Sequence, residues 1–200
     1  MEKEAYTIKN NETCEIEIKK SIFIANIIKV ENINDANEAL RLIRKKYYDA
    51  THNCYAYFIN DNDTTIEKAS DDGEPSQTAG PVILNVIKQN KLENVLIVIT
   101  RYFGGIKLGA GGLVRAYSKS ASEVVSKCEI FKIIKKELLK IEIDYQYLNE
   151  VTRYLSSFEC SDKVFLDKVS LTYNIDSSKI EEVKANLIEL TKGSIVILSI

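Results

Sequence analysis

The sequence predicts an α+β protein built from two domains, residues 1–133 and residues 134–200. Runs rich in β-branched residues, which favour strands, alternate along the chain with segments that carry apolar residues at helical spacing. This alternation restarts after about Cys128, and 200 residues suffice for one large domain or two small ones. No stretch rich in glycine, serine or proline separates the two parts, so we expect the domains to contact each other.

The elements expected in the first domain follow from apolar runs and helix signals. NVLIVITRY at residues 94–102 is nearly continuously apolar, which predicts a central strand buried on both faces. Asp35 and Glu38 have the spacing of a capping box, and Pro75 is placed to open another helix. Residues 61–74 are polar and end near an Asp-Gly turn signal, so we expect a loop there. The expected strands are 13–19, 22–30, 53–60 and 94–102, and the expected helices are 32–47, 78–90 and 110–128.

The second domain has a different order of elements. Its expected strands are 131–144, 160–166, 169–175 and 194–200, and its expected helices are 145–158 and 177–191. The second helix is the clearer one, because Ser178 and Glu181 form a capping box ahead of an apolar face. The order is therefore strand, helix, strand, strand, helix, strand, which is that of the ferredoxin-like fold.

Composition and cysteine spacing exclude several classes of protein. The net charge is −2 and 45% of the residues are hydrophobic, which is ordinary for a globular chain that buries a core. No apolar run is long enough to span a bilayer, and the charged N-terminus carries no secretory signal. Cys14, Cys54, Cys128 and Cys160 form no CxxC pair, so neither a zinc site nor a disulfide framework is indicated. We expect a cytoplasmic protein with reduced thiols, no membrane partner, no bound metal and no cofactor.

Charge is unevenly distributed within the first domain. Residues 61–74 hold six acids and one lysine, whereas residues 88–127 hold seven bases and two acids. The basic stretch either faces an external anion or is neutralised by the acidic loop folding onto it. Both interpretations stay open at the level of sequence.

The most distinctive stretch is TRYFGGIKLGAGGLVRAY at residues 100–117, called here the glycine-rich segment. It holds five of the eight glycines within nine residues and leads from the expected central strand into a helix. Bare N–H groups at a helix N-terminus suit a phosphate or a carboxylate, and aromatic rings can stack on bases. The candidate residues for binding an anion or nucleic acid are Arg101, Tyr102, Phe103, Gly104, Gly105, Lys107, Gly109, Gly111, Gly112 and Arg115.

The named nucleotide-binding motifs do not fit this segment. No glycine precedes Lys-Ser or Lys-Thr at P-loop spacing, and Val114 stands at the third glycine position of the Rossmann fingerprint. Neither ATP nor NAD is therefore indicated by a motif. The alternative to a binding loop is a tight structural crossover in which Arg101 pairs with the acidic loop.

His52 and an acidic cluster are the other candidates for chemistry. His52 and Cys54 would share one face of a strand, as a cysteine–histidine pair requires, although a lone histidine is more often structural. Asp71, Asp72 and Glu74 are carboxylates of the kind that bind Mg²⁺ or act as a general base. The alternative is a supporting acidic loop that caps the next helix or pairs with arginines, and no catalytic residue is assigned.

Five segments carry a resemblance to a known family. They are KKSIFIA (19–25), DATHNCYAY (49–57), SDDGEP (70–75), TAG (78–80) and VITRYFGGIKLGAGGLVRAY (98–117). In this order they resemble the first domain of the Impact / YigZ family, and the remainder is similar to its bacterial two-domain branch. Two positions depart from the family pattern: Gln77 stands where a glycine is expected, and Pro81 follows TAG directly.

The resemblance implies a first domain with the fold of ribosomal protein S5 domain 2 and a ferredoxin-like second domain similar to domain V of elongation factor G. The eukaryotic relatives regulate translation through a protein partner and carry a further N-terminal domain, for which this chain has no room, so their mechanism is not expected here. The resemblance and the basic loop favour a translation-associated regulatory module that binds RNA or the ribosome, without DNA specificity. The alternatives are a protein-interaction module docking through the same loop, and a small enzyme acting on a phosphorylated or acidic metabolite.

Overall fold

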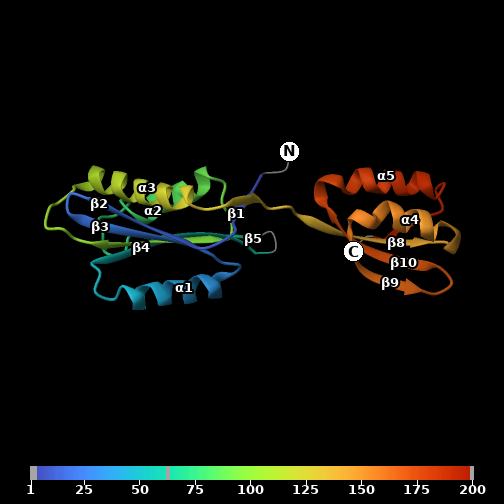
Figure 1. Ribbon diagram of the computed structural model, residues 1–200, viewed down its shortest axis with the longest axis horizontal. Helices are drawn as coiled ribbons and strands as arrows, with labels where there is room; N and C mark the ends of the chain where they lie inside the picture. The colour runs from blue at the N-terminus through green and yellow to red at the C-terminus, as the bar shows by residue number, and fades with distance from the viewer. Residues whose placement is uncertain (1–3, 62–63, 199–200) are drawn as a thin grey trace. The chain divides into compact units, whose positions relative to one another are not determined.

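The computed structural model describes residues 4–61 and 64–198 and divides the chain into two compact units, Met1–Ile133 and Ile134–Ile200 (Figure 1). Parts of the expected acidic loop and of the expected last strand lie outside the described residues. Both units combine helices with antiparallel sheets, which confirms the mixed helix-and-strand composition expected from the sequence. Within the described ranges, no helix has both the length and the apolar character needed to cross a membrane.

The first unit is built on a five-stranded antiparallel sheet with the strand order β2-β3-β6-β4-β5. Its strands are β2 (Glu12–Ile18), β3 (Ser21–Lys29), β4 (His52–Asp61), β5 (Thr64–Ser70) and β6 (Val95–Tyr102). β6 lies in the middle of the sheet, and every residue from Val95 to Arg101 is buried. The expectation of a central strand buried on both faces is confirmed.

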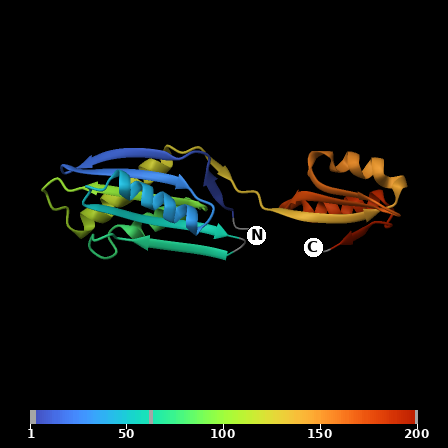
Figure 2. The same ribbon diagram turned by 90° about the horizontal axis from the view of Figure 1, so that it is seen from below.

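Helices cover both faces of this sheet, which explains the burial of β6. α2 (Gly80–Gln89) and α3 (Ala110–Ser126) lie on one face, and α1 (Ile33–Lys46) lies on the other (Figure 1). Figure 2, the view from below, shows α1 in front of the strands. Tyr117 of α3 is fully buried in the larger core, and Leu40 of α1 belongs to a smaller core on the opposite face. Apolar burial on two faces thus holds the sheet between its helices.

Three details of the first unit differ from the expectations. β5 occupies much of the segment expected to be a loop, because an edge strand with mostly exposed side chains shows no apolar alternation. Helix α2 begins at Gly80 with Pro81 in its first turn, so Pro75 does not open it. The N-cap of α1 is Asn32, whose side chain accepts a hydrogen bond from the backbone N–H of Asp35, so Asp35 is not the cap.

A further strand pairing was not predicted, and it splits the strand expected at 131–144 into β7 (Ile130–Lys132) and β8 (Lys136–Ile143). β1 (Tyr6–Ile8) pairs antiparallel with β7, and the backbone N–H of Ile133 donates to the carbonyl of Ala5. Strands of three residues are too short to show a periodic pattern. The pairing joins the two ends of the first unit, so only the folded chain reveals it.

The second unit has a four-stranded antiparallel sheet with the order β11-β8-β10-β9. Its elements are β8 (Lys136–Ile143), α4 (Leu148–Tyr154), β9 (Glu159–Phe165), β10 (Val169–Asp176), α5 (Ile180–Leu190) and β11 (Val196–Leu198). Short 3₁₀ turns flank α4, so the helix expected at 145–158 is interrupted. Both helices lie on one face of the sheet (Figure 1), and the unit has its own core, which includes Ile141 and Leu187.

Candidate functional site

A buried ion pair joins the acidic loop to the glycine-rich segment. Arg101, near the end of β6, donates from Nη1 to Oε1 of Glu74 across 2.6 Å, and the two side chains are only 6% and 3% exposed. The guanidinium also contacts the rings of Phe23 and Phe103, at 5.5 and 5.4 Å from their centroids. The charge of Arg101 is therefore neutralised inside the protein, which differs from the expected contact with an external phosphate.

Glu74 is the centre of a wider polar network. Its Oε1 also accepts a hydrogen bond from the hydroxyl of Tyr117 at 2.8 Å, and that hydroxyl accepts one from the Cys54 thiol at 3.2 Å. His52 Nε2 lies 3.9 Å from Glu74 Oε2, and His52 Nδ1 lies 2.8 Å from the backbone carbonyl of Asp72. Residues from three separate segments, namely 52–54, 72–74 and the glycine-rich segment, thus form one cluster, which holds the loop against the sheet.

The other two carboxylates of the acidic loop also serve the fold. Asp71 Oδ1 accepts hydrogen bonds from the backbone N–H groups of Ala79 and Gly80, at the start of α2, both at 2.9 Å. Asp72 accepts from the backbone N–H of Asn53 at 2.7 Å and pairs with Arg44 at 2.8 Å. The sequence left open whether these carboxylates bind an ion, act as a base, cap the next helix or pair with arginines. In the structure Asp71 caps α2 and Asp72 pairs with Arg44. Among the described residues, no group of His, Cys, Asp and Glu has an arrangement that would hold a metal ion.

The loop after Glu74 accommodates the departure from the family pattern at Gln77. Gln77 has φ +66°, in the left-handed region where a glycine is less strained. Its backbone N–H donates to Asp71 Oδ2 at 2.9 Å, which offsets part of that strain. The departure therefore leaves the cap of α2 intact.

The glycines of the glycine-rich segment have different structural roles. A Cβ atom at Gly104 would overlap the backbone of Lys20, in the turn between β2 and β3. Gly105 and Gly109 have φ +82° and +72°, where glycine is favoured. Gly111 and Gly112 lie in the first turn of α3, whose N-cap Gly109 provides no side-chain hydrogen bond. A Cβ atom at Gly112 would lie only 2.9 Å from Cβ of Leu108, so close packing and turn geometry account for four of the five glycines. Gly111 has no such constraint, and together with Gly112 it leaves the first turn of α3 bare.

The aromatic residues of the segment are only partly available to a ligand. The hydroxyl of Tyr102 donates to Asp49 at 2.8 Å, and the side chain is half-buried. Phe103 is 47% exposed, although Arg101 lies against its ring. Phe103 therefore remains a candidate for stacking, whereas Tyr102 is held against the protein.

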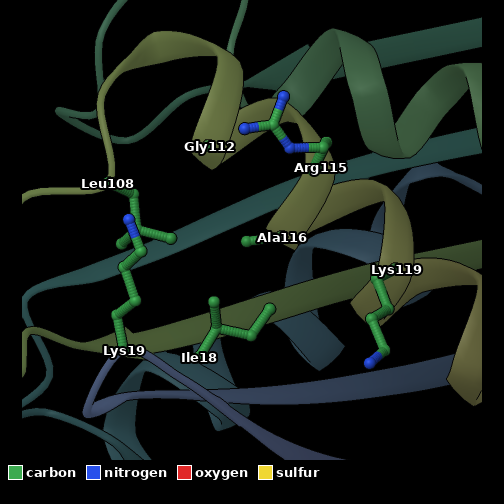
Figure 3. Close-up of a pocket in the computed structure, with 7 residues that line it drawn as sticks. All are labelled: Ile18, Lys19, Leu108, Gly112, Arg115, Ala116 and Lys119. Carbon is green, nitrogen blue, oxygen red and sulfur yellow. The ribbon is translucent and has the colours of Figure 1, made fainter.

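A cavity of about 180 Å³ lies beside the glycine-rich segment (Figure 3). Its lining consists of Ile18, Lys19, Leu108, Gly112, Arg115, Ala116 and Lys119. The first two residues come from β2 and the turn after it, Leu108 comes from the glycine-rich segment, and the other four belong to α3. Three of the lining residues are cations and none is an acid, so the cavity is suited to an anion.

Sequence reasoning identified only part of this lining. Gly112 and Arg115 were candidates, whereas Lys19 and Lys119 were not. Lys119 follows Arg115 by four residues in α3, a spacing that places both on one side of a helix and that could have revealed it. Lys19 lies in the turn between β2 and β3, which the two expected strands bracket, but nothing in the local sequence indicates that this turn lies beside α3. Within the described residues, no side chain forms an ion pair with these cations or with the exposed Lys107.

Cys54 is predicted to resist alkylation in the folded protein. Burial, together with the nearby Glu74 and Asp72 carboxylates, raises the pKa of its thiol to about 12, despite the opposing hydrogen bond with Tyr117. Because the thiolate is the reactive form, iodoacetamide at pH 8 should leave Cys54 unmodified, and it should modify all four cysteines in denaturant. Peptide mass spectrometry measures this, and rapid labelling of Cys54 in the folded state would contradict the burial.

The same shift predicts a loss of stability at alkaline pH. The folded-state pKa of Cys54 lies above the ordinary value of 9.0. The contribution of the protonated thiol to the free energy of unfolding is therefore complete below pH 9 and is lost as the pH rises toward 12. Melting temperatures measured across this window should therefore fall. Cys54→Ser keeps a hydrogen-bonding group that does not ionise there, and it should show a smaller fall.

Comparisons with known proteins agree with the sequence segments described above. The model of the Impact N-terminal domain matches residues 19–125. The chain is 38% identical over 190 residues to the IMPACT family member YvyE of Bacillus subtilis, across 94% of this chain and 87% of that protein. It is 29% identical over 189 residues to the IMPACT family member YigZ of Escherichia coli, across 92% of each. A crystal structure described as that of a hypothetical protein has a TM-score of 0.68 and 26% identity, across 100% of this chain and 98% of that one. The chain therefore belongs to the Impact family.

Proposed function

We propose that this protein is a translation-associated module that binds RNA or the ribosome through the basic surface around its glycine-rich segment. The observation that carries the proposal is a group of exposed cations beside the bare first turn of α3, none of which forms an ion pair with another described residue. The group consists of Lys19, Lys107, Arg115 and Lys119. Such side chains neutralise phosphates and supply most of the affinity for a nucleic acid. Membership of the Impact family supports the link to translation, because the eukaryotic relatives that the sequence resembles regulate translation.

The arrangement of elements supports a proposal for the two domain folds. We propose the fold of ribosomal protein S5 domain 2 for the first unit and a ferredoxin-like fold, similar to domain V of elongation factor G, for the second. In the second unit, the strand order β11-β8-β10-β9 and the two helices on one face support this assignment. Both folds occur in translation factors, which supports the function by analogy.

Co-sedimentation with ribosomes and with single-stranded RNA across a salt series tests the function. The wild-type protein should bind, and its affinity should fall as the salt concentration rises. The variant Lys107→Ala/Arg115→Ala should bind more weakly and should lower the logarithmic salt slope by about 1.4, since each phosphate contact to a single strand contributes about 0.7.

A matched control separates these contacts from the total charge. Lys9 and Lys88 are exposed lysines of the same unit that pair with Glu129 and Glu67. Lys9→Ala/Lys88→Ala changes the net charge by the same amount and should leave binding close to that of the wild type. Binding that is insensitive to salt, or equal losses in both variants, would contradict the proposal.

A protein partner is the second candidate, favoured by apolar exposure on the same segment. Phe103 and Ile106 are 47% and 42% exposed, and aromatic or apolar side chains of this kind anchor protein interfaces. Ile106→Ser removes apolar surface without changing charge. Ribosome binding that withstands salt and is lost in Ile106→Ser would favour this function. Catalysis is not part of either proposal, because Glu74, one of the carboxylates considered as a general base, is held by Arg101 and Tyr117.

A further inference from the structure

The cavity beside α3 concentrates positive charge more than an RNA backbone requires. Proteins that follow a single strand usually spread their cations along a groove. Here Lys19, Arg115 and Lys119 line one cavity of about 180 Å³, with no acid in the lining. Like charges around one cavity repel one another until an anion neutralises them. A ligand that carries more than one negative charge on a single group would satisfy this arrangement best.

Arg115 is placed beside free backbone donors. A Cβ atom at Gly111 would lie 3.6 Å from Nη1 of Arg115, so the guanidinium lies against the first turn of α3. The first N–H groups of a helix lack partners within the helix. The N-cap Gly109 makes no side-chain hydrogen bond, and the first turn of α3 contains no acidic residue. Arginine offers a planar pair of donors that matches a phosphate. The guanidinium and the helix start can therefore bind the same group.

Lys19 is held at the cavity by a turn with a fixed backbone. Ile18 and Ser21 pair directly, so Lys19 and Lys20 form a two-residue turn, and both have left-handed φ values of +48° and +63°. Gly104 packs against the backbone of Lys20, which fastens the turn to the glycine-rich segment. Figure 3 shows Lys19 beside Leu108, across the cavity from the cations of α3. The positive charge thus comes from two sides of the cavity.

The floor of the cavity is apolar. Ile18, Leu108 and Ala116 supply the apolar part of the lining, and Ile18 and Ala116 lie between Lys19 and Lys119 in Figure 3. The volume of about 180 Å³ is several times the roughly 30 Å³ occupied by a water molecule in the liquid. The cavity therefore has room for a phosphate and part of an attached sugar, which would contact the apolar floor.

We propose that this cavity binds the terminal phosphate of 5′-phosphorylated RNA, an inference that rests on the proposed function. A phosphate monoester carries a charge of about −1.5 to −2 near pH 7, whereas each phosphodiester of the backbone carries a single charge. Three cations around one cavity select the more highly charged group. A free nucleoside 5′-monophosphate presents the same chemistry, so the experiment has to separate the two sources.

Fluorescence anisotropy with two single-stranded RNAs tests the inference. The oligonucleotides share one sequence and a 3′ label, and they differ only in a 5′ phosphate or a 5′ hydroxyl. At fixed low ionic strength, the phosphorylated RNA should bind about tenfold more tightly, the ratio expected from one charge-assisted hydrogen bond. A nucleoside 5′-monophosphate should compete with the phosphorylated RNA, and the corresponding nucleoside should not.

Variants test whether the preference for 5′-phosphorylated RNA arises in the cavity. Lys19→Gln and Arg115→Gln should reduce the affinity ratio of the two RNAs to about one, because each removes a charge from the lining. Lys107→Gln is the matched control: Lys107 is exposed on the glycine-rich segment but does not line the cavity, so both affinities should fall while their ratio is kept. Thermal unfolding shows that each variant is folded.

The outcomes distinguish the inference from the function on which it rests. Equal, salt-sensitive affinities for both RNAs would overturn the terminal-phosphate site and leave RNA binding in place. Binding of the nucleoside monophosphate without any RNA binding would contradict the proposed function, keep the phosphate site and identify a metabolite as its source. If neither RNA nor the monophosphate binds, both proposals are wrong.

Discussion

Replacing Arg101 with methionine should lower the free energy of unfolding by about 3–5 kcal/mol, the cost of removing one partner from a buried ion pair. Glu74 would stay in the interior at 3% exposure, where the Tyr117 hydroxyl still donates to Oε1 and His52 lies 3.9 Å from Oε2. Without its cation, an ionised carboxylate has few interactions to offset the free-energy cost of removing it from water. Denaturant unfolding followed by circular dichroism measures the change.

A double-mutant cycle identifies the ion pair as the cause. Glu74→Leu should also be strongly destabilising, because it leaves the guanidinium of Arg101 buried. Arg101→Met/Glu74→Leu removes both charges, and we expect it to be more stable than either single variant. Additive losses would contradict the pairing, because they would mean that the two side chains contribute independently.

Gly104→Ala should destabilise the first unit by about 3 kcal/mol, the upper end of the usual cost of overpacking. The added methyl group would overlap the backbone of Lys20, and a backbone cannot rotate away as a side chain can. The change should also displace the turn that carries Lys19, so the affinity for 5′-phosphorylated RNA should fall in the same variant. Thermal unfolding and the RNA titration described above measure the two effects.

Gly111→Ala is the control for this prediction. A Cβ atom at Gly111 makes only an ordinary contact of 3.6 Å with Arg115, and the position is helical. Alanine favours a helix over glycine by up to about 1 kcal/mol, so this variant should be as stable as the wild type or slightly more stable. If Gly104→Ala were equally harmless, the close contact with Lys20 would not constrain the fold.

The candidate site was predictable from sequence only in part. The glycine-rich segment and the basic charge around it are local features, and Gly112 and Arg115 do line the cavity. The sequence could not show whether Arg101 faces solvent or pairs with Glu74, because both arrangements are compatible with the same local residues. Lys19 is separated from α3 by some ninety residues, and only the hairpin brings it to the cavity.

Local interactions explain which elements the sequence predicted well. The uninterrupted apolar run of β6 and the helical spacing of α3 reflect burial and backbone geometry within one segment, so single-segment patterns identify them. The edge strand β5 buries few side chains, and its partner β4 stabilises it through backbone hydrogen bonds that any sequence can form. The start of α2 depends on the side chain of Asp71, nine residues before Gly80, and Pro75 was therefore misread as the signal.

The sequence by itself determined the mixed composition of helices and strands, most of the longer elements and the family. These depend on local periodicity and on short sequence motifs, whereas β1 and the edge strand β5 show no such pattern. Tertiary structure decided which charges meet. It paired Arg101 with Glu74 in the interior, where desolvation makes a partner necessary, and it left Lys19, Arg115 and Lys119 around one cavity without acids. Whether a cation is neutralised or available depends on distances across the sheet, and those distances exist only in the folded chain.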